Sequence, residues 1–222
     1  MRLSVIIPTL NEEKYLPKLL NSLTLIQPYE IIVVDGGSLD KTIEIAQHFG
    51  VKILNTNKGR GLQLHQGALA ATGDFFLFLH ADTYFIEKVD FSILKENNIK
   101  AAFFEISFEE KKPSLKILSQ LINLRSKFLS LPYGDQGLFI ERDLYFKVGG
   151  FKPIPFLEDL DFILRLRKIY PPKCLATKLI VSGRKFKSHL PTYPLWLSLK
   201  NNLLILLYLC GLSPEFLKKF YK

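Results

Sequence analysis

The chain has 222 residues, of which 48% are hydrophobic and 23% are charged, enough to bury one globular core. This composition excludes a disordered chain, and 13 glycines and 12 prolines without a period exclude a collagen-like one. The net charge of +9 is uneven, because residues 173–222 carry nine basic residues and one acidic residue. Such a basic segment is typical of proteins that meet an anionic partner, or of a solvated basic face.

The first hundred residues alternate short apolar runs with amphipathic stretches. Strands are predicted over residues 3–7, 30–34, 51–54 and 75–79. Most of these runs are apolar at nearly every position, which is typical of strands covered on both faces. Helices are predicted between them, over residues 12–23, 40–49 and 61–71. This alternation predicts right-handed βαβ units in an α/β fold: a Rossmann-like, mostly parallel sheet flanked by helices.

The second half is less regular. Strands are predicted over residues 101–108 and 137–141, and helices over residues 114–129 and 159–168. An apolar helix at residues 195–208, interrupted by polar residues 200–202, and a basic helix follow. We expect a catalytic body over residues 1–190, with halves at 1–100 and 101–190, and an amphipathic helical tail over 191–222. No signal peptide or membrane-spanning helix is predicted.

Acidic residues follow the predicted strands. Glu12 comes after the first strand, Asp35 ends the second, and Asp82 follows the strand at 75–79. Each has an ordinary explanation as a turn or helix-cap residue. Together they would meet at the carboxyl edge of the sheet, where ligands bind in open α/β folds. Like charges gathered there repel one another unless a cation or a hydrogen-bond donor lies between them.

A nucleotide carrying phosphates would complete such an edge. A carboxylate can accept a base N–H, a divalent cation can bridge a carboxylate to a diphosphate, and Lys58 and Arg60 lie on a glycine-containing loop within reach of phosphates. Gly59-Arg60-Gly61 lacks the third glycine of the dinucleotide fingerprint, and no Gly-Lys-Ser/Thr occurs. These absences argue against a kinase, a P-loop NTPase or an NAD enzyme.

Several motifs in order along the chain resemble those of the family 2 glycosyltransferases. They are VIIPTLNEE at 5–13, IVVDGGS at 32–38, GRG at 59–61, ATGD at 71–74, FLHADT at 78–83, GGF at 149–151 and FLED at 156–159. The resemblance implies a GT-A fold and inverting transfer of a sugar from a UDP- or GDP-sugar to a hydroxyl acceptor, with a lipid-linked acceptor as one option. It also implies a divalent cation, Mn²⁺ or Mg²⁺, and no nucleic acid partner.

The resemblance also implies residue roles. The base, ribose and phosphates of the donor would contact Pro8, Thr9, Glu12, Asp35, Lys58 and Arg60. Asp82 matches the last acid of the Asp-x-Asp motif that holds the metal, while His80 stands where the first acid is usual and is either a nitrogen ligand or a strand-end histidine. A mixed oxygen and nitrogen site suits manganese. Asp159 would be the general base, and its alternative role is to cap its own helix.

On the acceptor side, residues 131–137 form a candidate acceptor loop with Asp135 and Gln136, beside Glu158 of the Glu-Asp pair. Arg184 belongs to a cationic stretch, residues 184–187, that is suited to a diphosphate or to lipid phosphates. His189 is a weaker candidate for an extra metal ligand. The sequence of the tail predicts one of two arrangements: packing on the body, or peripheral attachment to the cytoplasmic face of a membrane.

Two other functions fit the residues. A sugar nucleotidyltransferase shares the open α/β plan, but it opens with a glycine-rich loop that residues 8–12 lack. A non-catalytic protein could bind anionic lipid or nucleic acid through the basic tail, with no dependence on Asp82 or Asp159. With two cysteines and no disulfide framework, we expect a reducing, cytoplasmic setting.

Overall fold

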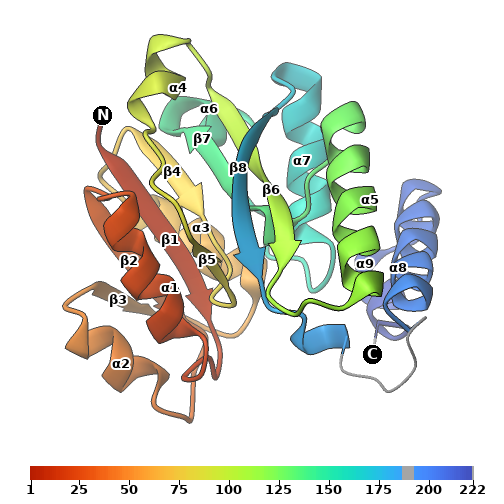
Figure 1. Ribbon diagram of the computed structural model, residues 1–222, viewed down its shortest axis with the longest axis horizontal. Helices are drawn as coiled ribbons and strands as arrows, with labels where there is room; N and C mark the ends of the chain where they lie inside the picture. Colours follow the sequence, from red (N-terminus) through yellow and green to blue (C-terminus); the bar gives the residue numbers. More distant parts are fainter. Residues whose placement is uncertain (187–192, 222) are drawn as a thin grey trace.

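Eight strands form one mixed sheet in the order β3-β2-β1-β4-β7-β6-β8-β5 (Figure 1). The computed structural model describes residues 1–186 and 193–221. The strands are β1 (Leu3–Thr9), β2 (Glu30–Asp35), β3 (Lys52–Asn55), β4 (Phe75–Phe78), β5 (Thr83–Phe85), β6 (Ala101–Phe108), β7 (Leu138–Glu141) and β8 (Lys173–Val181). One continuous sheet therefore joins the two predicted halves of the body.

The first four predicted strands form the parallel part of the sheet. β1 pairs in parallel with β2 and β4, and β2 pairs in parallel with β3. All seven residues of β1 are buried, as its apolar run predicts. β7 is antiparallel to β4 and β6, whereas β8 is parallel to β6. The predicted Rossmann-like α/β sheet is confirmed, with antiparallel pairs in its second half.

Helices cover both faces of the sheet. One face is covered by α1 (Leu16–Ser22), α2 (Thr42–His48) and α4 (Ser92–Glu96), and the other by α3 (Arg60–Ala70), α6 (Arg142–Lys147) and α7 (Glu158–Ile169). Helix α5 (Pro113–Leu129) packs against the ends of β6 and β8. Because both faces are covered, the central strands are apolar at most positions.

The pairing directions bring the functional segments to one edge of the sheet. The carboxyl ends of β1, β2, β4, β6 and β8 all point that way, and the antiparallel β7 begins there. In Figure 1 this is the lower edge, toward which the arrows of β1, β6 and β8 point. The candidate site is therefore built from loops that are distant in sequence and adjacent in space.

The tail consists of α8 (Tyr193–Leu209) and α9 (Pro214–Lys218), which lie beside α5 and α7 (Figure 1). Leu204, Ile205 and Leu217 are buried in the same core cluster as α7. The tail thus packs on the body. As predicted, one helix runs through this segment, and polar residues 200–202 interrupt only the apolar character of its sequence. None of the described helices is long and apolar enough to span a bilayer.

Some elements escape the sequence pattern. β5, α4, α6 and β8 were not predicted, and α1 begins at Leu16, four residues later than expected. The carbonyl of Glu12 accepts hydrogen bonds from Tyr15 and Leu16, so residues 12–15 form a turn that precedes the helix. The first half of β8 alternates between exposed and half-buried positions and therefore lacks an apolar run.

Candidate active site

Asp35, at the end of β2, organises the loop that follows it. The Asp35 side chain is 2% exposed, and its Oδ2 accepts hydrogen bonds from the backbone N–H groups of Gly37 at 2.8 Å and Ser38 at 2.7 Å. Its Oδ1 accepts hydrogen bonds from the hydroxyl of Ser38 and from the hydroxyl of Thr9, the latter at 3.0 Å. The ordinary turn interpretation of this motif is therefore correct, and the same bonds hold the carboxylate beside the end of β1.

Gln63 of α3 is a positioning residue that no sequence pattern indicated. Its Nε2 donates to the carbonyls of Thr9 and Val34, both at 2.8 Å, and so ties the ends of β1 and β2 together. Gln63 is 4% exposed. In the sequence, Gln63 is one polar residue of an amphipathic helix, and that pattern does not predict this role.

Arg184 connects two of the acids that the sequence placed at this edge. Its two Nη atoms donate to both carboxylate oxygens of Glu12 at 2.7 Å, and its Nε lies 2.9 Å from Oδ2 of Asp82. The guanidinium also stacks on Tyr15, 4.5 Å from the ring centroid. Burial opposes the charge of Arg184, but the hydrogen bond to Glu12 and the charge of Asp82 raise its pKa. The repulsion expected between the acids is thus relieved by a cation from the chain itself.

A cavity of about 460 Å³ opens beside Asp82. Its acidic, basic and histidine lining residues are Arg60, His80, Asp82, Arg125, Asp135, Asp159 and Lys185. These come from loops and helices between residues 60 and 185, so the structure brings the predicted metal, base and acceptor residues into one space. Lys185 and Arg125 were not predicted as site residues, although Lys185 lies in the cationic stretch.

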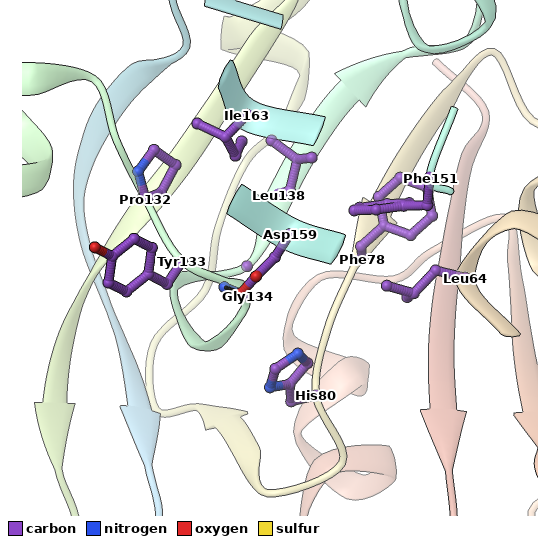
Figure 2. Close-up of a pocket in the computed structure, with 11 residues that line it drawn as sticks. Leu64, Phe78, His80, Pro132, Tyr133, Gly134, Leu138, Phe151, Asp159 and Ile163 are labelled. Atoms are coloured by element: carbon purple, nitrogen blue, oxygen red, sulfur yellow. Dashed lines mark hydrogen bonds between the residues drawn. The ribbon is translucent and has the colours of Figure 1, made fainter. Parts of the chain in front are cut away.

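Asp159, in the first turn of α7, lines this cavity and is held in place by two backbone hydrogen bonds. The backbone N–H of Gly134 donates to its Oδ2 at 2.9 Å, and the N–H of Leu160 donates to its Oδ1 at 2.8 Å. Figure 2 shows Asp159 and Gly134 side by side, with the His80 ring facing them. A Cβ at Gly134 would lie 2.6 Å from Nε2 of His80 and 3.2 Å from Oδ2 of Asp159, so this close approach requires a glycine.

Two titratable groups beside Asp159 have shifted pKa values. Burial lowers the pKa of His80 well below its ordinary value, and the charges of Arg60, Lys185 and Arg184 act in the same direction. The imidazole is therefore neutral at neutral pH. Arg60 forms an ion pair with Glu158, which is 2% exposed. Burial opposes the charge of Arg60, but attraction to Glu158 and Asp159 raises its pKa.

The two polar residues of the predicted acceptor loop, residues 131–137, lie in different surroundings. Asp135 lines the large cavity, where burial raises the pKa of its carboxyl against the opposing charges of Lys185 and Arg125. Gln136 is fully buried within the loop, where its Oε1 accepts from Ser126 and its Nε2 donates to the carbonyl of Phe104 at 3.2 Å. The contacts of Gln136 hold the loop in place and do not reach the cavity.

The remaining predicted residues lie outside the cavity lining. Pro8 pairs with Val34 in the sheet, and Lys58 is exposed in the loop before α3. Glu158 reaches the site through Arg60. His189 lies outside the described residues, so its proposed role as a metal ligand stays a prediction.

The metal prediction can be tested against the donor set. Among residues 1–186 and 193–221, no three His, Cys, Asp or Glu side chains form a ready-made metal site. Mg²⁺ is, however, commonly held by one or two carboxylates together with substrate phosphates. Asp82 fits that arrangement, and the neutral imidazole of His80 can add a nitrogen ligand suited to Mn²⁺.

Comparison with known proteins supports the predicted resemblance. Residues 4–99 match the model of the family described as "Glycosyl transferase family 2". The chain is 29% identical over 184 residues, 74% of its length, to an uncharacterised glycosyltransferase of Haemophilus influenzae, and it spans 61% of that relative. The predicted resemblance to the family 2 glycosyltransferases is therefore confirmed.

Solved structures show the same fold. The chain is similar to Staphylococcus aureus TarS 1–349 in complex with UDP, with a TM-score of 0.67 and 20% identity, covering 82% of this chain and 60% of that one. It is also similar to a mannosyltransferase from Pyrobaculum calidifontis in complex with GDP-Man and Mn²⁺, with a TM-score of 0.58 and 18% identity, covering 81% and 56%. These likenesses confirm the predicted GT-A fold.

Proposed function

We propose that the chain is an inverting glycosyltransferase that moves a sugar from a nucleoside-diphosphate sugar to a hydroxyl acceptor. The observation that carries this proposal is the convergence of His80 and Asp82, from the loop after β4, and Asp159, from α7, on one cavity at the carboxyl edge of the sheet. The names of the relatives support the same class of reaction.

In this proposal Asp159 is the general base. The N–H groups of Gly134 and Leu160 fix both of its oxygens and leave the carboxylate beside the cavity. A base must lie within about 3 Å of the oxygen whose proton it removes. The acceptor oxygen then attacks the anomeric carbon from the face opposite the diphosphate, which inverts the configuration.

The leaving diphosphate needs positive charge that is already in position. Arg60 and Lys185 line the cavity, and Arg184 lies at its edge between Glu12 and Asp82. Preorganised charges of this kind lower the barrier because their interaction strengthens as the sugar–phosphate bond breaks. A divalent cation held by Asp82 and by the phosphates would add Lewis-acid stabilisation of the same charge.

The nucleoside would lie at the ends of β1 and β2. Asp35, bonded to Thr9, presents a fixed carboxylate next to the loop that carries Glu12. Solved structures of relatives contain UDP or GDP-Man, which supports a donor whose base is either uracil or guanine.

A thermal-shift panel of UDP, GDP and ADP, each with and without Mn²⁺, tests the proposal. A ligand at a hundred times its Kd adds about 2.7 kcal/mol of stability. We expect a uridine or guanosine nucleotide to raise the Tm, and the Asp82→Ala variant to lose the Mn²⁺-dependent part of that rise. The donor reaction should release nucleoside diphosphate. Release of pyrophosphate, or the absence of a shift with every nucleotide, would refute the proposal.

We also propose peripheral contact of the tail with a membrane. Opposite its buried residues, α8 exposes Trp196, Leu199, Leu203 and Leu206 along one stripe, and lysines lie on α8 and α9. Apolar side chains beside lysines suit an anionic bilayer surface. In co-sedimentation with vesicles containing anionic lipid, the paired change Leu199→Glu and Leu203→Glu should reduce binding. The matched control, Ile86→Glu, changes an exposed apolar residue on the body. Equal binding of all three proteins would exclude this contact.

A further inference from the structure

The large cavity continues from the reaction centre into an apolar groove between α5 and the tail. Asp82, Asp159 and Arg60 line its charged end. Most of its remaining wall is apolar, with residues from α5, β6, α7, β8 and α8: Phe108, Leu118, Ile122, Leu160, Val181 and Ile205. Its volume of about 460 Å³ is in the range of small-molecule sites.

Polar atoms without a partner lie in the same cavity. Among the described residues, the buried side-chain atoms that lack a hydrogen-bond partner are Nε of Arg125, Oδ1 of Asp135 and Oδ1 of Asn201. All three residues line the cavity. Buried polar groups are normally hydrogen-bonded, and leaving one unpaired costs about 1–3 kcal/mol. Their gathering in one space indicates that a ligand with polar groups completes it.

The polar interruption in the sequence of α8 has the same explanation. Asn201 and Asn202 line the cavity together with Ser198. On the opposite side of α8, Leu199 and Leu203 are exposed. The face of α8 that turns toward the cavity is therefore mixed, with amide and hydroxyl groups beside Leu197 and Ile205. A helix that only packed against the body would have no need for these amides.

We propose that the acceptor is an amphipathic alcohol, with its hydroxyl at Asp159 and its hydrocarbon body between α5 and α8. This inference rests on the proposed function. The acceptor oxygen forms a bond to the anomeric carbon, the sugar–phosphate bond breaks, the nucleoside diphosphate leaves with the electron pair, and the hydroxyl proton passes to Asp159. The hydrocarbon removes the apolar walls from water, and the polar groups next to the hydroxyl meet Arg125, Asp135 and Asn201.

A chain-length series of acceptors tests the inference. Butyl, hexyl and octyl β-glucosides present the same hydroxyls on hydrocarbon chains of increasing length, and each is used below its critical micelle concentration. If the chain enters the groove, binding measured by calorimetry should tighten by about fourfold for each added CH₂ group. Equal affinity for glucose and for all three alkyl glucosides would overturn the inference.

Matched variants locate the binding. Ile122→Glu places a charge in the groove, whereas Leu121→Glu places the same charge on the outside of α5, at a side chain that is 52% exposed. Ser198→Phe fills the groove from α8, and Ser198→Ala leaves it open. We expect Ile122→Glu and Ser198→Phe to abolish the dependence on chain length, and the two controls to keep it. A loss of equal size in the controls would overturn the inference.

Sugar transfer to water separates this inference from the proposed function, since it needs the donor site and Asp159 but no acceptor. The groove variants should hydrolyse a UDP- or GDP-sugar at the rate of the unmodified chain. Release of nucleoside diphosphate without any preference for longer chains would overturn the inference alone. Binding that depends on chain length, with neither transfer nor hydrolysis, would refute the enzymatic function and support the ligand class.

Discussion

The predicted nucleotide half of the molecule and its predicted acceptor half are built differently. In the first half, Asp35 accepts four hydrogen bonds from its own neighbourhood, and Glu12 is paired with Arg184. In the second half, Arg125, Asp135 and Asn201 each keep a buried polar atom without a partner among the described residues. The acids of the first half are thus paired within the protein, with Arg184 supplied by the second half, whereas the acceptor side keeps polar atoms that no described residue pairs.

The family match divides the chain at nearly the same place. The glycosyltransferase family model matches residues 4–99, which is almost the whole of the predicted nucleotide half. Several of the cavity walls come from α5, the 131–137 loop, α7 and α8, all beyond that match. We infer that these later elements build the acceptor groove, whereas the donor reaction draws on both parts of the chain, since Asp159, Arg184 and Lys185 also lie beyond residue 99.

Replacement of Asp159, the proposed base, should give the largest effect. Asp159→Asn keeps the size and shape of the side chain but removes its ability to accept a proton. It keeps only one of the two N–H contacts, because the amide nitrogen cannot accept a hydrogen bond. General-base catalysis contributes about 10²–10⁴-fold, so we expect the transfer rate to fall by that factor. Donor affinity in the thermal-shift assay should stay unchanged. A variant that transfers sugar at the normal rate would show that another group is the base.

The Asp35→Ala change probes the predicted nucleotide half. It leaves the N–H groups of Gly37 and Ser38 and the hydroxyl of Thr9 without their acceptor. We expect the free energy of unfolding, measured in urea, to fall by about 2–3 kcal/mol, together with loss of nucleotide binding. For comparison, Asp135→Ala removes a carboxylate that has an unpartnered oxygen and a raised pKa. It should cost much less stability, and an equal cost would contradict the contrast between the halves.

Gly134→Ala tests the junction between the halves, because a Cβ there would meet His80 of one half and Asp159 of the other. The methyl group must displace at least one of these side chains. We expect kcat to fall about tenfold or more, since small misplacements of reacting groups are costly, with little change in donor KM. An unchanged kcat would show that the close packing around Asp159 is not needed for the reaction.

The smallest expected effect concerns pH and a second contact between the halves. Burial lowers the pKa of His65, whose Nδ1 lies 3.1 Å from the hydroxyl of Tyr145. Below about pH 6.5, the ordinary value for imidazole, the unfolded chain takes up this proton before the folded one. Stability should therefore fall as the pH drops through that range.

The His65→Gln variant should lose less stability than the unmodified protein between pH 7.5 and 5.5, as measured by urea unfolding. His48→Gln, at an exposed position on α2, is the control. Identical pH dependence in His65→Gln and in the unmodified chain would mean that this contact does not contribute.

Local sequence is enough to predict the parallel half of the fold and the acids that follow its strands. Continuous apolar runs leave a strand no face for water, and the carboxyl ends of parallel strands share one edge, so the order of residues alone places Asp35 and Asp82 there. Linear motifs also indicated Asp159, because the Glu-Asp pair begins α7.

The way in which these groups are joined depends on the packing of distant segments. The pairing of Arg184 with Glu12 spans 172 positions, and the cavity gathers residues from Arg60 to Tyr221, so no local pattern could reveal either one. The same holds for Arg125 and Asn201, which look like ordinary surface residues of amphipathic helices. Their burial arises only when α5 and α8 pack beside each other and enclose the groove between them.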